Sequence, residues 1–279
     1  LFAGGGFTEA GGVPADYIAK WDGLSWTGLE SGMNATVWAL TVFDDGTGPA
    51  LYAGGNFTEA GGSATGVARW DGSSWSPLGT GMNGTVHALT GFDDGTGRAL
   101  YAAGRFTVAD GAVVNRIAKW DGASWQPLES GTSAPIFAMA NFDDGTGTAL
   151  YVAGEFRNAS GTPARHIARW DGSSWSRLDQ GTNVPPIEAL YVFDDPTGSA
   201  LFACGSFWEA GGAPSVGVAR WGSQCVAVPC PADVTGDNAI DLADLNLVLA
   251  NFGQATTDGD ATGDGNVDLA DLNAVLGAF

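Results

Sequence analysis

The sequence is poor in basic residues and has no long apolar run. Its 279 residues include 11 Lys and Arg against 31 Asp and Glu, so the formal net charge is −20 at pH 7. A chain this acidic is repelled by polyanions, which argues against nucleic acid or an anionic membrane surface as its partner. No apolar stretch approaches the roughly 18 residues that a membrane-spanning helix needs, so we expect no membrane insertion.

Sustained helical periodicity is also missing from residues 1–221, where glycine is too frequent for helices. This region contains a repeat instead. Copies of a motif such as LYAGGNFTEAGG (51–62) begin at residues 1, 51, 100, 150 and 201. A period near 50 residues with several short apolar segments in each unit predicts the blades of an all-β propeller.

Each unit is predicted to contain four strands. In the second unit they cover residues 37–43, 50–57, 66–71 and 73–78, with DDGTG and DG as tight turns between them. Neighbouring blades cover both faces of a blade, so polar and apolar residues should not alternate. The first of these strands, VWALTVF, is nearly continuously apolar, and the recurring tryptophans are predicted to pack between blades.

Counting the units gives three complete blades, at residues 36–79, 85–129 and 135–179, and partial ones at 1–29 and 186–221. The leading unit lacks its inner strand, and GSQCVAV is a doubtful outer strand for the last. Since the chain begins inside a predicted strand without Met or a signal peptide, we expect a piece of a longer protein. A five-bladed ring and a ring of six or seven blades, with the others upstream, are both compatible with this pattern.

The pattern LYAGGNF, VARW, DG and SSW resembles kelch-like repeats, in which a glycine pair ends a strand and spaced aromatic residues follow. It is still more similar to the propeller repeats of fungal cortical-marker proteins, which share the GG-x-F, I-A-x-[YW] and W-x-x-L-G elements. The resemblance covers residues 1–221. It implies a β-propeller in a cell-surface or extracellular setting, and it implies no chemistry.

Residues 233–244 and 260–271 are two copies of one acidic loop. Oxygen-bearing side chains at loop positions 1, 3, 5, 9 and 12, with the backbone carbonyl at position 7, match the ligand spacing of an EF-hand-type calcium loop. The predicted ligands are Asp233, Thr235, Asp237, Ala239, Asp241 and Asp244, then Asp260, Thr262, Asp264, Asn266, Asp268 and Asp271. The sequence therefore predicts two Ca²⁺ ions, with threonine as the weaker ligand at position 3.

Only exiting helices, at residues 242–252 and 269–279, are predicted beside these loops, because Pro229 and Pro231 forbid a helix before the first loop. Two loop–helix units of this kind resemble a type I dockerin, and the resemblance covers about residues 231–279. It implies a small α domain that folds with Ca²⁺ and binds a cohesin-like protein domain.

In dockerins, loop positions 10 and 11 help to choose the partner. The resemblance therefore assigns partner binding to Leu242, Ala243, Leu269 and Ala270. The predicted domain order is a propeller at 1–221, a linker at 222–230 and a dockerin at 231–279. Nine Asp and no Lys or Arg lie in residues 222–279, so we expect this small unit to need metal for folding.

The three cysteines, Cys204, Cys225 and Cys230, lie near the predicted junction. Cys225 and Cys230 could pair with each other, or Cys204 could form a disulfide bond with the linker. Cys204 aligns with Gly or Ala in the sister copies, so the plainer interpretation is a small buried residue. Extracellular Ca²⁺ is millimolar and would fill loops of modest affinity, which favours a secreted protein.

Several residues of the repeat could belong either to a catalytic site or to a turn. His87 and His166 occupy unrelated positions of the repeat, so a histidine metal centre is not expected. The D-G-x-S-W element is similar to the sialidase Asp-box, but its Asp and Trp stand four residues apart instead of five. The FDD carboxylates recur in every copy and are predicted to form turns: Asp44/Asp45, Asp93/Asp94, Asp143/Asp144 and Asp194/Asp195.

Three functions stay open at this point. The first, which we prefer because no copy breaks the repeat convincingly, is a secreted, non-catalytic propeller. It would bind a glycan or a cell-surface protein and be tethered through the dockerin to a cohesin-like partner. The second is a dockerin-bearing carbohydrate-active enzyme of polysaccharide degradation, with its catalytic part upstream. The third is a structural surface protein that binds only calcium.

Overall fold

The computed structural model describes residues 1–195 and 198–222, together with Leu247 and Asn251. The chain forms two compact units. The first consists of Leu1–Asp143, Gly147–Phe193 and Leu201–Trp221. The second consists of Asp144–Thr146, Asp194–Ala200 and Gly222–Phe279, and most of it lies outside the described residues.

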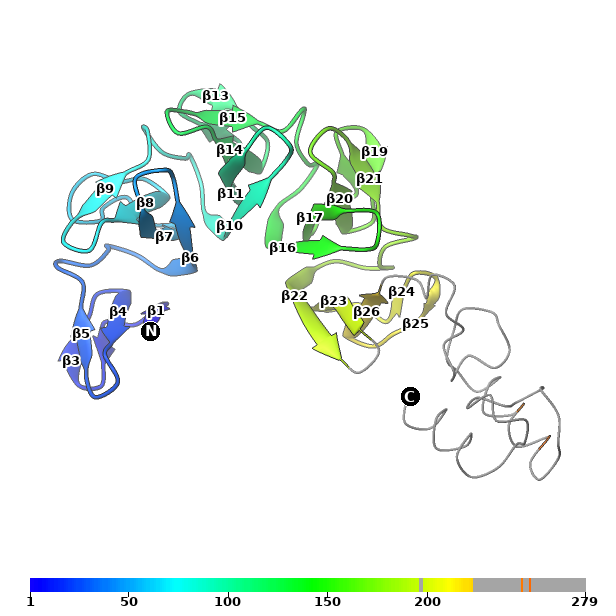
Figure 1. The fold of residues 1–279 in the computed structure, drawn as a ribbon, viewed down its shortest axis with the longest axis horizontal. Coiled ribbons are helices and arrows are strands. Elements are labelled where there is room, and N and C mark those ends of the chain that lie inside the picture. The colour runs from blue at the N-terminus through cyan, green and yellow to red at the C-terminus, as the bar shows by residue number, and fades with distance from the viewer. Residues whose placement is uncertain (196–197, 223–246, 248–250, 252–279) are drawn as a thin grey trace. The chain divides into compact units, whose positions relative to one another are not determined.

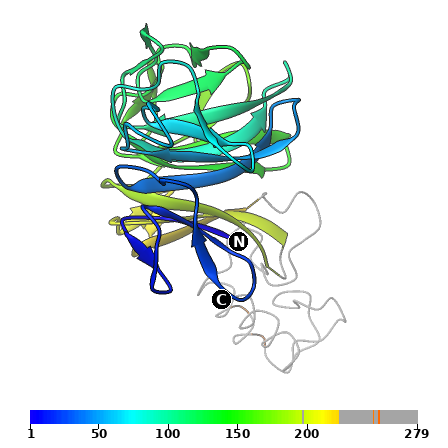
Figure 2. The same cartoon turned by 90° about the vertical axis from the view of Figure 1, so that its left-hand side faces the viewer.

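Five antiparallel sheets follow one another along the described chain and form its blades (Figure 1). The second, third and fourth blades have four strands each, and the first and fifth have three within the described residues. This confirms the predicted all-β propeller repeat. Figure 2 shows the same sheets from the side as narrow ribbons with the twist expected of β-sheets.

The inner strands face a common centre in Figure 1; they are β6 (Val37–Asp44), β10 (Val86–Asp93), β16 (Ile136–Asp143) and β22 (Ile187–Asp195). The second strands are β1 (Phe2–Gly4), β7 (Pro49–Gly55), β11 (Arg98–Gly104), β17 (Thr148–Gly154) and β23 (Gly198–Gly205). The third strands are β4 (Ile18–Trp21), β8 (Val67–Trp70), β14 (Ile117–Trp120), β20 (Ile167–Trp170) and β26 (Val218–Gly222). The outer strands are β5 (Trp26–Gly28), β9 (Trp75–Pro77), β15 (Trp125–Pro127) and β21 (Trp175–Arg177).

A small hairpin projects between the second and third strands of most blades. The hairpins are β2 (Glu9–Ala10) with β3 (Val13–Pro14), β12 (Val108–Ala109) with β13 (Ala112–Val113), β18 (Asn158–Ala159) with β19 (Thr162–Pro163), and β24 (Glu209–Ala210) with β25 (Ala213–Pro214). In the second blade a single bridge between Glu59 and Ser63 takes this place.

The hydrophobic core lies between neighbouring blades. One cluster joins Phe43 and Tyr52 of the second blade to Leu100 and Trp125 of the third. Trp125 is only 1% exposed, and its Nε1 donates a hydrogen bond to the Leu78 carbonyl of the preceding blade at 3.3 Å. The predicted packing of tryptophans between blades is therefore confirmed.

Burial on both faces is strongest in the second strand of a blade, not in the inner strand. All but the first residue of β7, β11 and β17 are buried, whereas β6 mixes buried, half-buried and exposed residues. The expected loss of alternation is thus confirmed, but at a different strand from the one that looked most apolar.

The interpretation of Cys204 as a small buried residue is wrong, because its side chain is exposed. The aligned residues Gly54, Ala103 and Ala153 are buried against the following blade. Among the described residues no further blade follows the fifth, so the same face of β23 stays accessible. Its neighbour Phe193 is likewise 54% exposed, whereas the aligned Phe43 is 3% exposed. Cys225 and Cys230 lie outside the described residues.

Candidate binding site

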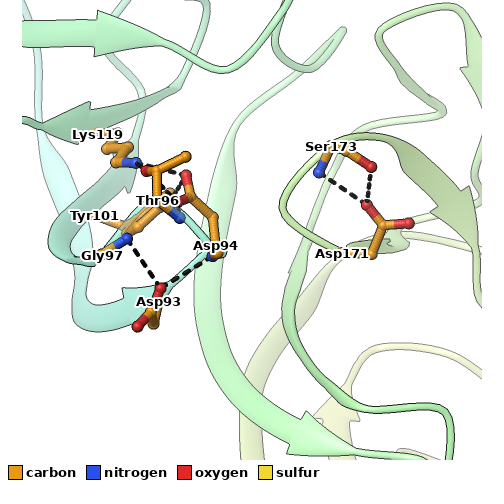
Figure 3. A network of polar contacts seen from close by, with 9 residues as sticks. Asp93, Asp94, Thr96, Gly97, Tyr101, Lys119, Asp171 and Ser173 are labelled. Atoms are coloured by element: carbon orange, nitrogen blue, oxygen red, sulfur yellow. Dashed lines mark hydrogen bonds and ion pairs between the residues drawn. The ribbon is translucent and has the colours of Figure 1, made fainter.

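The FDD turns at one end of the inner strands are built by side chain–backbone hydrogen bonds (Figure 3). In the third blade Asp93 Oδ1 accepts from the backbone N–H groups of Gly95 (2.9 Å) and Gly97 (3.1 Å). Asp94 Oδ1 accepts from the N–H and the hydroxyl of Thr96, at 3.1 and 2.6 Å. Equivalent bonds from Asp44 and Asp45 close the turn of the second blade, so the prediction that these carboxylates form turns is confirmed there.

In the second and third blades the second carboxylate of the turn also ties three strands together. Asp94 Oδ2 accepts from the hydroxyl of Tyr101 at 2.8 Å and from Lys119 Nζ at 2.5 Å (Figure 3). Burial by itself raises the pKa of Asp94, but the hydrogen bonds from Lys119, Thr96 and Tyr101 outweigh it and hold that pKa below its ordinary value. Burial, followed by the bond to Asp94, raises the pKa of Tyr101.

The second blade repeats this arrangement with an arginine in place of the lysine. Tyr52 donates to Asp45 Oδ2 at 3.0 Å, and Arg69 Nε lies 3.3 Å from the same oxygen. Burial and the Asp45 carboxylate raise the pKa of Tyr52 to about 12. A network that recurs in the second and third blades serves the fold, since it ties the same three strands together in both.

The D-G-x-S-W elements form a second type of turn. Asp171 Oδ1 accepts from the N–H groups of Ser173 and Ser174, each at 2.8 Å, and from the Ser173 hydroxyl at 2.9 Å (Figure 3). Hydrogen bonds from the backbone of Ser173 and Ser174 hold the pKa of Asp171 well below its ordinary value. Asp71 and Asp121 do the same in their blades. The carboxylate is therefore occupied within its own turn.

His166 has a structural environment. It occupies a repeat position with a positive φ, +71° here and +80° at the aligned Gly66, which glycine and few other residues adopt readily. Its side chain is 1% exposed, and Nδ1 lies 2.9 Å from the Thr182 hydroxyl. The aligned Arg116 likewise reaches the carbonyl of Thr132 at 3.0 Å. Both side chains connect a blade to the segment that leads into the next one.

The opposite end of the inner strands carries residues that differ between blades. The second residue of β6, β10 and β16 is Trp38, His87 and Phe137, respectively. Each falls where the register with the second strand shifts, for example between Val86 and Ala88. Such a bulge leaves a residue unpaired and re-aims its side chain. The backbone therefore presents one non-repeated side chain from each of three blades.

These three side chains form a continuous row of rings across the blades. The ring centroids of Trp38 and His87 are 5.5 Å apart with planes at 63°, and those of His87 and Phe137 are 5.2 Å apart at 86°. Edge-to-face geometry of this kind is favourable for aromatic pairs. Trp38, at one end of the row, is 56% exposed. An exposed tryptophan held in a packed row is a typical binding feature.

Two charged residues extend the row at its other end. The guanidinium carbon of Arg105 lies 5.1 Å from the centroid of the Phe137 ring. Its Nη2 lies 3.5 Å from Glu155 Oε1, and both side chains are well exposed. A guanidinium over a ring is a cation–π contact. We define the inner-strand cluster as Trp38, His87, Phe137, Arg105 and Glu155.

Desolvation dominates the electrostatics of His87. Burial lowers the pKa of its imidazole, and the nearby Arg105 charge lowers it further. Its Nε2 is buried, and within the described part of the chain no hydrogen-bond partner reaches it. Near neutral pH the imidazole is therefore uncharged and acts mainly as a ring between two other rings. The structure does not bring His87 together with His166, which lies in the fourth blade.

The repeat aligns His87 with Trp38, Phe137 and Glu188, and sequence reasoning did not recognise a site at this position. The signal was available in the repeat. This position changes from copy to copy, and so does the one between the glycine and the phenylalanine at the end of each second strand, although that glycine and that phenylalanine are the same in every copy. Between that glycine and phenylalanine, the residues of the five copies are Gly6, Asn56, Arg105, Glu155 and Ser206. The sequence alone could not show that side chains at these two repeat positions come into contact across blades.

The comparison with known families agrees with this fold. The family model described as the Rax2 C-terminal beta propeller domain matches residues 15–207, well over half of the chain. The chain belongs to this family. Among curated proteins, none matches it. The Rax2 match runs from the first blade into the fifth, so it includes every residue of the inner-strand cluster.

The Rax2 match ends at residue 207 and therefore does not include the predicted calcium ligands or the predicted partner-binding residues. All the predicted calcium ligands, from Asp233 to Asp271, and the predicted partner-binding residues Leu242, Ala243, Leu269 and Ala270 lie outside the described residues. Leu247 and Asn251 are both helical, and Asn251 Nδ2 donates to the Leu247 carbonyl at 3.0 Å. In the part of the chain that the structure describes, no helix is long and apolar enough to cross a membrane.

Proposed function

We propose that this chain is a non-catalytic binding propeller whose binding surface is the inner-strand cluster. The observation that carries the proposal is the packed row of three rings at an inner-strand position whose residue differs between the blades. The turn carboxylates recur from copy to copy, whereas the residues at these facing positions change, and binding of a ligand would account for that change. Tryptophan and arginine together are also the residues most enriched where binding energy concentrates.

The chemistry of the cluster favours a protein partner over a glycan. Its polar groups are the charged Arg105 and Glu155 rather than neutral amides, and both are more than a third exposed. Charged groups around an aromatic anchor select a partner of complementary charge. Similarity to cortical-marker repeats supports a location at the cell surface or outside the cell. A glycan ligand is the other outcome of the test below.

The test compares two exposed tryptophans in the full chain. Trp38→Ala removes the end of the aromatic row, whereas Trp208→Ala removes a tryptophan that is 60% exposed in the fifth blade. Each variant is applied to arrays of cell-surface protein fragments and of glycans. We expect bound protein fragments to be lost with Trp38→Ala and retained with Trp208→Ala. Equal binding by both variants would refute the inner-strand cluster as the binding surface.

The proposal also includes a tether at the C-terminal end. The ligand spacing of the two acidic loops and the predicted exiting helices support a dockerin-like module that binds two Ca²⁺ ions and docks on a cohesin-like domain. Residues 242–243 and 269–270 would contact that domain. The tether and the binding surface are separate claims, and each has its own measurement.

Calorimetric titration of the full chain with Ca²⁺ tests the tether. We expect heat of binding for two ions and a gain of helical circular dichroism that EGTA reverses. The variant Asp260→Ala with Asp264→Ala removes two ligands of the second loop and should abolish one of the two sites. Asp258→Ala is the matched control, since it removes an aspartate that lies just before that loop. Absence of calcium binding would remove the tether from the proposal.

A further inference from the structure

A small hollow lies at the junction of the second and third blades, beside their FDD turns. Phe43 and Asp45 of the second blade line one side of it, and Arg98, Trp120 and Asp121 of the third blade line the other. Its volume is about 200 Å³. Pockets for drug-sized ligands begin at roughly 300 Å³, so this hollow has room for a group the size of one side chain. All its lining residues belong to the first compact unit, and the junction has a described blade on either side.

The same place is closed at the junction of the third and fourth blades. There the DG turn of the fourth blade packs against the FDD turn of the third, and a Cβ at Gly172 would collide with the carbonyl of Asp94. A Cβ at the aligned Gly122 would meet no atom of the described residues within 4 Å. Trp170 is 6% exposed, whereas the aligned Trp120 is half-buried. Trp120 is therefore accessible from the hollow that it lines.

Two departures from the repeat meet at this hollow. The position of Arg98 is held in the other copies by short side chains, those of Pro49, Thr148 and Ser199. The guanidinium carbon of Arg98 lies 6.0 Å from the centroid of the Phe43 ring, so the side chain reaches across to the second blade. Gly91 leaves room for it, since a Cβ there would lie 3.3 Å from Arg98 Nε. The aligned residues Val42 and Asn141 both have side chains.

Arg98 is the cation of the hollow that has no counter-ion among the described residues. Lys119, which also lines the hollow, is paired with Asp94 at 2.5 Å. Asp45 is paired with Arg69 at 3.3 Å. Arg98 is exposed, and in the described part of the chain no ion pair joins it to a carboxylate. A guanidinium stacked on a ring keeps its N–H edge free and can donate two parallel hydrogen bonds to a carboxylate.

The carboxylates in the wall of the hollow are already occupied. Asp121 Oδ1 accepts from the N–H groups of Ala123 and Ser124, and its Oδ2 accepts from Ser124 Oγ and Gln126 Nε2. Asp45 is likewise bonded within its own blade. A sugar needs acceptors for several hydroxyl groups, and these two carboxylates have none to spare. The negative charge of Asp121 also disfavours a ligand with two negative charges.

The accessible groups of the hollow are thus one cation, Arg98, and one ring, Trp120. A glutamate side chain complements both, since its methylene groups can pack on a ring while its carboxylate accepts from a guanidinium. We infer that the hollow binds a single glutamate side chain of a partner protein, with Arg98 as the residue that pairs with it. The net charge of −20 repels a strongly acidic partner, so this glutamate is one with neutral or basic neighbours.

This contact goes beyond the proposed function. Arg98 pairs with Asp93 at the FDD end of β10, whereas His87 of the inner-strand cluster lies at the opposite end of the same strand. The two sites therefore have separate residues and separate tests.

A direct binding measurement tests the inference on the full chain. The probe is a blocked pentapeptide with one central glutamate flanked by serine and glycine, and the matched probe carries glutamine, which has the same shape without the charge. The Nε–H signal of Arg98 is identified in a nuclear magnetic resonance spectrum by its loss in Arg98→Lys. We expect a saturable shift of this signal with the glutamate peptide, and an affinity about tenfold lower or less for the glutamine peptide. Equal affinities for both peptides would overturn the inference.

A matched pair of substitutions sharpens the test. Arg98→Thr installs the residue that the fourth blade has at this position, so the strand should accept it. It should weaken binding of the glutamate peptide about tenfold. The urea midpoint of unfolding should not change, because Arg98 is exposed. Arg177→Thr is the control, since it removes an exposed arginine of β21 and should leave the affinity unchanged. If Arg98→Thr folds poorly, the Nε–H shift in the unchanged chain still decides the question.

Three other results would assign the carboxylate elsewhere. If Arg98→Thr folds and binds the glutamate peptide as tightly as the unchanged chain, the inference is wrong. If binding is lost in Arg105→Thr and kept in Arg98→Thr, the contact belongs to the inner-strand cluster, so the inference fails and the proposed function stands. If sodium glucuronate shifts the Arg98 signal at a lower concentration than the glutamate peptide does, the hollow is a site for a sugar acid and not for a protein side chain.

Discussion

The two ends of the inner strands differ in what the repeat preserves. At the FDD end, Asp94 and its counterpart Asp45 make the same bonds to a tyrosine and a basic residue. At the other end, roughly 20 Å away along β10, the aligned residues are Trp38, His87 and Phe137. The comparison shows that the FDD end keeps one stabilising network in the second and third blades, whereas the residues at the other end vary, as the proposed binding function requires.

The largest effect is expected at the FDD end. Asp94→Ala would leave Tyr101 and Lys119 without their common partner in a place where the Asp94 side chain is only 8% exposed. Breaking a largely buried charged pair from one side costs about 3 kcal/mol. The measurement is the free energy of unfolding in urea. Glu155→Ala at the variable end is the control and should cost less than about 1 kcal/mol, because its ion pair with Arg105 is exposed.

A pH titration of stability would test the environment of the two histidine rings. Burial lowers the folded-state pKa of His166 below the ordinary 6.5, so the unfolded chain binds the proton more readily. Stability is therefore unaffected above about pH 6.5 and falls as the pH drops below it, by at most about 1.4 kcal/mol per pH unit for one group. His166→Asn should flatten this slope, since asparagine tolerates the positive φ. Burial also lowers the pKa of His87, so His87→Gln should flatten the slope as well. A slope that is unchanged in His166→Asn would contradict the contribution of His166.

Removing a single hydroxyl at the FDD end should have a smaller effect. Tyr101→Phe deletes the bond to Asp94 and keeps the buried ring, so we expect a loss of about 1 kcal/mol in the free energy of unfolding. Tyr52→Phe in the second blade should lose a similar amount through Asp45. Thermal unfolding of both variants checks the equivalence of the blades. Strongly unequal losses would show that the turn networks are not interchangeable.

The smallest effect on stability is expected where the proposed effect on binding is largest. Trp38→Ala removes a side chain that is more than half exposed, and it should change the free energy of unfolding by less than about 1 kcal/mol. The same denaturation experiment measures this variant beside Asp94→Ala. If both variants were destabilised alike, the division between a structural end and a binding end would not hold.

The sequence by itself determined the architecture of the described region. A unit of about 50 residues recurs with its turn residues, apolar strands and tryptophans, and each of these features acts locally or between adjacent copies. The FDD and DG turns could be predicted because a carboxylate bonds to N–H groups two to four residues further on. The strand order followed from the same pattern, within a residue or two at most strand ends.

Only the tertiary structure decided which residues meet across blades. Arg105 and Phe137 are distant in sequence, and neither carries a motif, so their contact depends on how one blade packs on the next. Cys204 illustrates the same limit, since its exposure depends on what covers the face of its blade and not on its own type. The repeated sequence predicts the hydrogen bonds within each turn. A cluster made of the residues that differ between copies forms only when the blades pack side by side.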